Sequence, residues 1–235
     1  VRDGHCSSCH AGHGSSETKL LKATGQKLCG QCHGDLSKEV KGNTVHAPFT
    51  GGVCQDCHAP HASNNAGMLV KEQGSLCLSC HADMGQKMKA SAAVHKPVKD
   101  GSCTKCHNPH QAKLAKLLLA VSPDMCVVCH KDLKERLVKE NKHSPAASDC
   151  LICHGSHMTA EPKLLNDKVS SFCSQCHDLK GDAFKKSHIY IDASVMDCKS
   201  CHDPHASKDP KFFKTNVHAP FAGRSCDECH IVKPK

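Results

Sequence analysis

The chain has 235 residues, of which 20 are cysteine and 21 are histidine, whereas tryptophan is absent and tyrosine occurs once. Leucine, isoleucine, valine and phenylalanine together make up less than about a fifth of the residues, which is too little for side chains alone to form a hydrophobic core. The formal net charge is +8, but the lysines are dispersed and no basic run is interleaved with aromatic residues, so we expect no nucleic acid partner. No stretch approaches the ~20 apolar residues that cross a membrane, so we expect no transmembrane segment.

The sequence Cys-x-x-Cys-His occurs ten times, and these copies contain every cysteine of the chain. This motif is typical of the covalent attachment of c-type haem, in which the two thiols form thioethers with the porphyrin and the adjacent histidine binds the iron. Zinc sites and disulfides also use closely spaced cysteines, but neither requires a histidine directly after the second cysteine. We therefore predict ten covalently attached haems c, each with one iron, and an apo-protein that is unfolded.

The residues predicted to hold these haems follow the chain in order. The thioether cysteines are Cys6, Cys9, Cys29, Cys32, Cys54, Cys57, Cys77, Cys80, Cys103, Cys106, Cys126, Cys129, Cys150, Cys153, Cys173, Cys176, Cys198, Cys201, Cys226 and Cys229. The proximal iron ligands are His10, His33, His58, His81, His107, His130, His154, His177, His202 and His230. No residue is predicted to be catalytic.

The motifs form a five-fold repeat with a period of about 48 residues, and each repeat unit, or module, contains a first and a second motif. Proline and glycine recur at the junctions, which favours short helical turns joined by loops, while period-2 apolar alternation is scarce. We predict mostly irregular coil with short α-helices and very little β structure, built around the haems as an elongated array. The array is expected to be one domain, 1–235, whose modules 1 to 5 are residues 1–45, 46–94, 95–142, 143–187 and 188–235.

Eleven histidines lie outside the motifs, and ten of them occupy positions that recur from module to module. Five follow a first motif as His-x-x-His, namely His13, His61, His110, His157 and His205. Five lie upstream of a motif, most of them followed two residues later by proline, namely His46, His95, His143, His188 and His218. The remaining one is His5, directly before the first motif. We predict that these residues supply the second axial ligands of bis-histidine irons.

A histidine three residues after a proximal ligand lies on the same side of a helical turn, so it cannot reach the opposite face of its own haem. The interpretation from sequence is that His13, His61, His110 and His157 ligate the second haem of their own modules. The upstream residues His46, His95, His143 and His188 are then expected to ligate the first haem of the module that they precede.

The two ends depart from this register. The first haem has no upstream histidine in register, whereas module 5 holds two candidate ligands, His205 and His218, for one haem. One interpretation is that His5 or His218 bridges into another copy of the chain. The other is that His5 is exposed and that the first haem uses another histidine or the α-amino group of Val1. The sequence leaves both open.

The segment from Cys103 to His110, preceded by His95 and Pro97, resembles the multihaem cytochromes with doubled Cys-x-x-Cys-His motifs, and the resemblance extends from His5 to His230. The resemblance implies low-potential bis-histidine haems in a wire-like order. That family includes decahaem cytochromes of outer-membrane porins and cytochromes that polymerise into extracellular filaments.

The expected function is therefore long-range electron transfer between other redox proteins, which act as donor and acceptor. A homopolymer with inter-subunit histidine ligation is one expected assembly, and a discrete periplasmic or porin-bound carrier is the alternative. A multihaem reductase with one open haem is a further alternative, and the first haem, whose second ligand is not assigned, is the only candidate for its substrate site. Because none of the ten motifs is altered and the remaining histidines are numerous enough to ligate every iron, we do not expect an enzyme. Since haem c is attached outside the cytoplasmic membrane, we expect an exported chain in an extracellular filament, in the periplasm or at the outer membrane.

Overall fold

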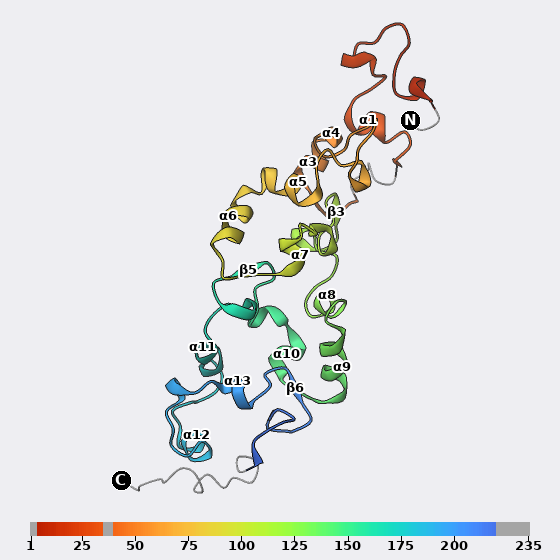
Figure 1. Ribbon diagram of the computed structural model, residues 1–235. Coiled ribbons are helices and arrows are strands. Elements are labelled where there is room, and N and C mark those ends of the chain that lie inside the picture. Colours follow the sequence, from red (N-terminus) through yellow and green to blue (C-terminus); the bar gives the residue numbers. More distant parts are fainter. Residues whose placement is uncertain (1–3, 35–39, 220–235) are drawn as a thin grey trace. The chain divides into compact units, whose positions relative to one another are not determined.

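A computed structural model describes residues 4–34 and 40–219, and it contains short helices joined by irregular segments (Figure 1). The motif residues Cys226, Cys229 and His230, together with Val1, lie outside the described residues. The chain divides into two compact units, the first made of residues 1–89 and 95–121 and the second of residues 90–94 and 122–235. Each unit therefore contains parts of several modules.

The helices of the described residues are short. The α-helices are α1 (Gly25–Cys29), α3 (Ala47–Thr50), α4 (Cys54–Cys57), α5 (Gln73–Cys80), α6 (Ala82–Ala90), α7 (Lys96–Lys99), α8 (Asp124–Val127), α9 (Lys131–Lys139), α10 (Ser144–Ser148), α11 (Val169–Ser174), α12 (Asp182–Ser187) and α13 (Cys198–Cys201). The 3₁₀ turns are η1 (Cys6–Ser8), η2 (Thr18–Leu20), η3 (Ala66–Met68), η4 (Cys103–Lys105), η5 (Ala115–Leu117), η6 (Cys150–Ile152), η7 (Pro162–Leu164) and η8 (Ala193–Val195).

Equivalent helices of different modules begin at equivalent residues. Each first motif forms a single turn of its own, whereas the four described second motifs lie at or near the ends of α1, α5, α8 and α11. Histidine is the N-cap residue of α3, α7 and α10, and proline occupies the first turn of each, where its missing N–H is not needed. The helix α5 is capped by the Glu72 carboxylate, which accepts hydrogen bonds from the backbone N–H groups of Gly74 and Ser75.

Strands of two residues connect modules that are not adjacent in position along the chain. In the first compact unit, β1 (Thr44–Val45) pairs antiparallel with β3 (Gln111–Ala112). In the second, β2 (Ala93–Val94) pairs with β5 (Met158–Thr159), and β4 (Asn141–Lys142) pairs with β6 (Ala206–Ser207). Each ladder joins the segment that precedes an upstream histidine to the segment that follows a His-x-x-His sequence. The strands therefore fix where these histidines lie.

A turn with left-handed backbone follows each described first motif. In module 3, Lys116 and Leu117 have φ values of 57° and 60°, a conformation that costs an L-residue roughly 1–2 kcal/mol. The equivalent residues of the other modules also have positive φ, at Lys19, Leu20, Gly67, Met68, Lys163, Leu164 and Phe212. The turn returns the chain so that the residue after it forms a β-bridge with the motif histidine, as in the pairs His10–Leu21, His58–Leu69, His107–Leu118, His154–Leu165 and His202–Phe213.

Side chains form almost no core of their own. Among the described residues, only Gly74, Ala206 and Ser207 are buried, and no large side chain is fully buried. Large apolar side chains such as Val138 and Val195 are 78% and 77% exposed. The predicted fold class, with short helices, little strand and five repeats, is confirmed, and the scarcity of apolar residues is matched by the scarcity of buried ones. The predicted module boundaries stay predictions.

None of the helices that the structure describes is both long enough and apolar enough to span a membrane.

Candidate haem sites

Every described motif has the same backbone turn. The N–H of the motif histidine donates to the carbonyl of the first cysteine four residues earlier, over 2.9–3.1 Å, in the motifs that begin at Cys6, Cys29, Cys54, Cys77, Cys103, Cys126, Cys150, Cys173 and Cys198. This turn places the first cysteine and the histidine one above the other on the same face. The shared turn therefore supports the same thioether attachment at every described motif.

The first-motif histidines are oriented by a second interaction. In each described case, ring Nδ1 lies 2.8–3.1 Å from a backbone carbonyl nine residues later, in the pairs His10–Lys19, His58–Gly67, His107–Lys116, His154–Lys163 and His202–Lys211. A carbonyl oxygen only accepts, so Nδ1 carries the proton and Nε2 is left to bind a metal. The left-handed turn supplies this carbonyl. Sequence reasoning missed the turn, although Lys-Leu-Leu recurs at 19–21, 116–118 and 163–165.

Pairs of histidine rings face each other at a separation that fits one iron between them. A metal–imidazole bond is about 2 Å long and the ring nitrogen lies about 1 Å from the ring centre, so two axial histidines have centroids roughly 6 Å apart. First-motif histidines meet His-x-x-His residues at 5.9 to 6.1 Å with interplanar angles of 16–25°, in the pairs His10–His61, His58–His110 and His154–His205. These residues fit bis-histidine ligation of haem.

Two second-motif histidines face upstream histidines of their own modules. The rings of His46 and His81 are 6.2 Å apart at 12°, and those of His143 and His177 are 6.2 Å apart at 18°. His46 Nδ1 lies 2.9 Å from the carbonyl of Pro109, and His143 Nδ1 lies 3.0 Å from that of Pro204. These contacts again leave Nε2 to the metal.

The partner assignment drawn from the sequence is therefore wrong for the pairs that the structure places together. His61 faces the first-motif histidine of the preceding module instead of the second motif of its own module, and His46 faces the second motif of its own module. The argument from helix geometry excluded only the haem of the histidine's own motif. The strand ladders decide which neighbouring haem a distal histidine reaches, because His46 follows β1 and its N–H donates to the His110 carbonyl. His188 was expected to ligate the first haem of module 5, and its ring does lie near the first-motif histidine His202, with ring centroids 6.4 Å apart and an interplanar angle of 51°.

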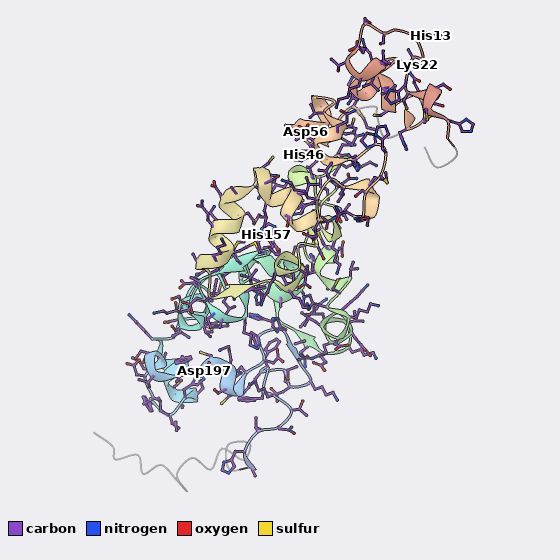
Figure 2. The ribbon with its side chains drawn as sticks, turned by 45° about the horizontal axis from the view of Figure 1, so that its top comes forward. His13, Lys22, His46, Asp56, His157 and Asp197 are labelled. Carbon is purple, nitrogen blue, oxygen red and sulfur yellow. The ribbon has the colours of Figure 1, made fainter. Side chains whose placement is uncertain are left out.

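Of the two interpretations of the chain ends, the facing rings of His61 and His10 favour the one in which the first haem uses another histidine of the chain. His33 and His13 instead face no other histidine among the described residues. His13 lies on the N-terminal loop (Figure 2). His5 is the N-cap residue of η1 and likewise faces no described histidine ring. His95 caps α7, His157 precedes β5 and His218 lies near the end of the described residues, and their ligation stays a prediction.

Cysteines of consecutive motifs lie next to each other. The side chains of Cys77 and Cys103 are neighbours, and so are those of Cys173 and Cys198 and those of Cys29 and Cys54. Each of these contacts joins the second motif of one module to the first motif of the next.

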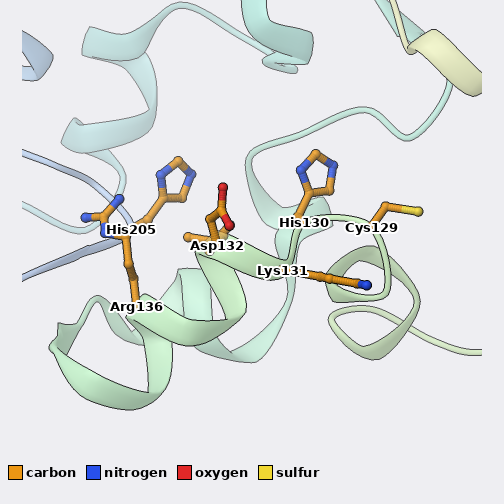
Figure 3. Close-up of a pocket in the computed structure, with 7 residues that line it drawn as sticks. Cys129, His130, Lys131, Asp132, Arg136 and His205 are labelled. Atoms are coloured by element: carbon orange, nitrogen blue, oxygen red, sulfur yellow. The ribbon is translucent and has the colours of Figure 1, made fainter.

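A pocket of about 580 Å³ in the second compact unit is lined by Cys129, His130, Lys131, Asp132, Leu133, Arg136 and His205. In the view of Figure 3, Asp132 lies between the rings of His130 and His205, and Arg136 lies beside His205. The pocket therefore borders a motif cysteine and its histidine on one side and a facing-pair histidine on the other. Burial lowers the pKa of His205, and the nearby Asp203 carboxylate only partly opposes this effect.

The comparison with protein families agrees with this geometry. The family model of the doubled CXXCH motif matches residues 1–38, 46–86, 95–135, 143–182 and 192–217, which is more than half of the chain. The chain belongs to the doubled CXXCH motif family. No curated protein matches the sequence.

Membership in this family gives the protein its general character. It is a multihaem c-type cytochrome, with haem attached covalently at its CXXCH motifs, and its family is one of electron transfer. Because haem c is attached outside the cytoplasm, the protein is exported. The match ends at residue 217, so the last motif rests on its sequence alone.

Proposed function

We propose that the chain carries ten haems c and moves electrons along them over long distances. The facing histidine pairs support this proposal most strongly, because centroid separations of 5.9–6.4 Å recur in both compact units. Haem held by two histidines supplies a one-electron Fe(III)/Fe(II) couple of low potential. The protein holds the irons, orients their ligands and sets the order in which electrons pass.

Two kinds of contact support a sequential order of the sites. Within module 2, the ligands of the two irons touch, since the His46 N–H donates to the His110 carbonyl over 2.9 Å. Between modules 2 and 3, the side chains of Cys77 and Cys103 are neighbours. Alternation of these contacts joins the first site of a module to its second, and the second to the first site of the next.

The second compact unit repeats this arrangement. The His143 N–H donates to the His205 carbonyl over 3.0 Å, which joins the two sites of module 4. The neighbouring side chains of Cys173 and Cys198 then join module 4 to module 5. In both units, the contacts link the haem sites in the order of their motifs along the chain. Such an order suits stepwise electron transfer, because each site passes its electron to the next.

The facing pairs favour a carrier over a reductase. An iron with a histidine on each side has no position for a substrate, and a reductase requires one. His33 faces no described histidine, so its iron is the candidate for an open site. The test is to measure carbon monoxide binding to the reduced, haem-loaded protein together with its intact mass. Ten haems and no bound carbon monoxide support the carrier, whereas stoichiometric binding at one iron supports the enzyme.

We further propose that the protein works in the periplasm or outside the cell, with other redox proteins as donor and acceptor. By the observed pairing rule, His13 faces a first-motif histidine of a preceding module, either in the same polypeptide or in another copy of the chain. If His13 ligated an iron of another copy of the chain, the copies would join into a filament. The alternative is a discrete or porin-bound carrier. Negative-stain electron microscopy of the haem-loaded protein separates these assemblies, because only the first gives filaments.

A further inference from the structure

The acidic residue Asp203 lies directly beside His205, whose ring faces that of His154 at 5.9 Å. One carboxylate oxygen of Asp203 accepts a hydrogen bond from the His205 backbone N–H at 2.9 Å. The same oxygen lies 3.6 Å from His205 Nδ1, and the Asp203 side chain is only 23% exposed. Solvent therefore screens this negative charge only in part.

The carboxylate is held in place from the helix α9. Its other oxygen lies 2.8 Å from Arg136 Nη2, and Arg136 also donates to the carbonyl of Ala206. Arg136 pairs with Glu140 as well, with 3.2 Å between Nε and the carboxylate. Because two carboxylates share one guanidinium, the cluster of Asp203, Glu140 and Arg136 keeps one net negative charge.

Module 3 provides a neutral counterpart of this arrangement. Asn108 occupies the position of Asp203, and its side-chain oxygen accepts a hydrogen bond from the His110 backbone N–H at 3.0 Å. His110 faces His58 at 6.1 Å, as His205 faces His154. An amide thus supports the backbone equally well, so the local fold does not require the charge.

We propose that Asp203 lowers the reduction potential of the iron held between His154 and His205. This inference rests on the proposed haem ligation. A carboxylate next to the outer nitrogen of an axial histidine raises the basicity of that ligand and favours the more positive Fe(III) state. Reduction adds one electron to the iron, and the negative charge opposes it. The iron between His58 and His110, with Asn108 beside it, lacks this effect.

The test exchanges the two side chains in the full haem-loaded protein. Asp203→Asn keeps the hydrogen bond to the His205 N–H and removes the charge, and Asn108→Asp adds a charge at the matched site. Each protein is titrated spectroelectrochemically, with a mediator as the electron donor, and its spin state and haem content are measured by electron paramagnetic resonance and intact mass.

In Asp203→Asn, one titrating component moves to higher potential, and its ferrous-to-ferric ratio at a fixed potential rises about tenfold, which is 59 mV for one electron. In Asn108→Asp, one component moves to lower potential. Curves that superimpose on the wild type, with all haems low-spin, would overturn the role of Asp203. If Asp203→Asn loses haem, Asn108→Asp alone tests the proposal: a shift to lower potential supports it, and no shift or a shift to higher potential overturns it. Wild-type protein without low-spin haem would instead refute the proposed function.

Discussion

Replacing His61 with alanine tests which iron each distal histidine serves. The rings of His61 and His10 face each other with centroids 5.9 Å apart, so the variant loses the sixth ligand of the iron held by His10. An alanine side chain has no donor atom with which to form a metal bond of about 2 Å. One iron of the proposed ten, or about a tenth of the total, therefore becomes high-spin. After reduction, the variant binds one carbon monoxide per chain.

A nine-haem background identifies the affected iron. The double substitution Cys77→Ser and Cys80→Ser removes the attachment of the haem held by His81. In that background, the structure predicts that His61→Ala still creates one high-spin iron, because the iron of His10 remains. The matched variant His46→Ala creates none there, because His46 faces His81 at 6.2 Å and its iron is already gone.

The measurement is quantitative electron paramagnetic resonance of the ferric proteins, with carbon monoxide titration as the second readout. The reasoning would be refuted if His61→Ala produced no new high-spin signal in the nine-haem background while His46→Ala produced one. That outcome would mean that His61 serves the second haem of its own module.

Three further predictions follow from the fold. Lys116→Gly removes a side chain from a residue with left-handed backbone at φ 57°, so it should stabilise the turn by about 0.5–1 kcal/mol. The backbone N–H of Asn108, which donates to the Leu117 carbonyl, should then exchange its hydrogen about threefold more slowly, and faster exchange would contradict this. Gly67→Lys is the reverse control. The haem-free chain should be unfolded, because among the described residues only Gly74, Ala206 and Ser207 are buried; a sharp thermal transition in circular dichroism of the apo-protein would show otherwise. Arg136→Gln removes the positive charge that pairs with the Asp203 and Glu140 carboxylates. The reduction potential of the iron held between His154 and His205 should therefore fall, and a rise would contradict the proposed effect of these charges.

The sequence predicts the attachment sites and the fold class because both depend on short-range patterns. The spacing from Cys54 to His58 is a property of one turn, and the repeat period is visible without any tertiary information. The low content of apolar residues correctly indicates that side chains do not pack into a core. Proline after His46 and His95 correctly marks the start of a helix.

The partners of the distal histidines were not predictable in the same way. Which iron His46 reaches depends on a ladder of only two residue pairs between β1 and β3, a contact that no local pattern specifies. The left-handed turn after each first motif was also missed, because Lys116 and Leu117 have no preference for positive φ. Its signal was the recurrence of the same three residues, not their propensities. The Arg136–Asp203 pair joins residues of different modules and has no repeat signature.

The most direct test of the central claim is a coulometric titration of the purified, haem-loaded protein, with visible spectra recorded at each step. The account predicts that each chain takes up ten electrons over a continuous range of low potentials, and that its spectra are those of low-spin haem throughout. Uptake of far fewer electrons, or a large high-spin fraction in the starting protein, would contradict a relay of bis-histidine haems.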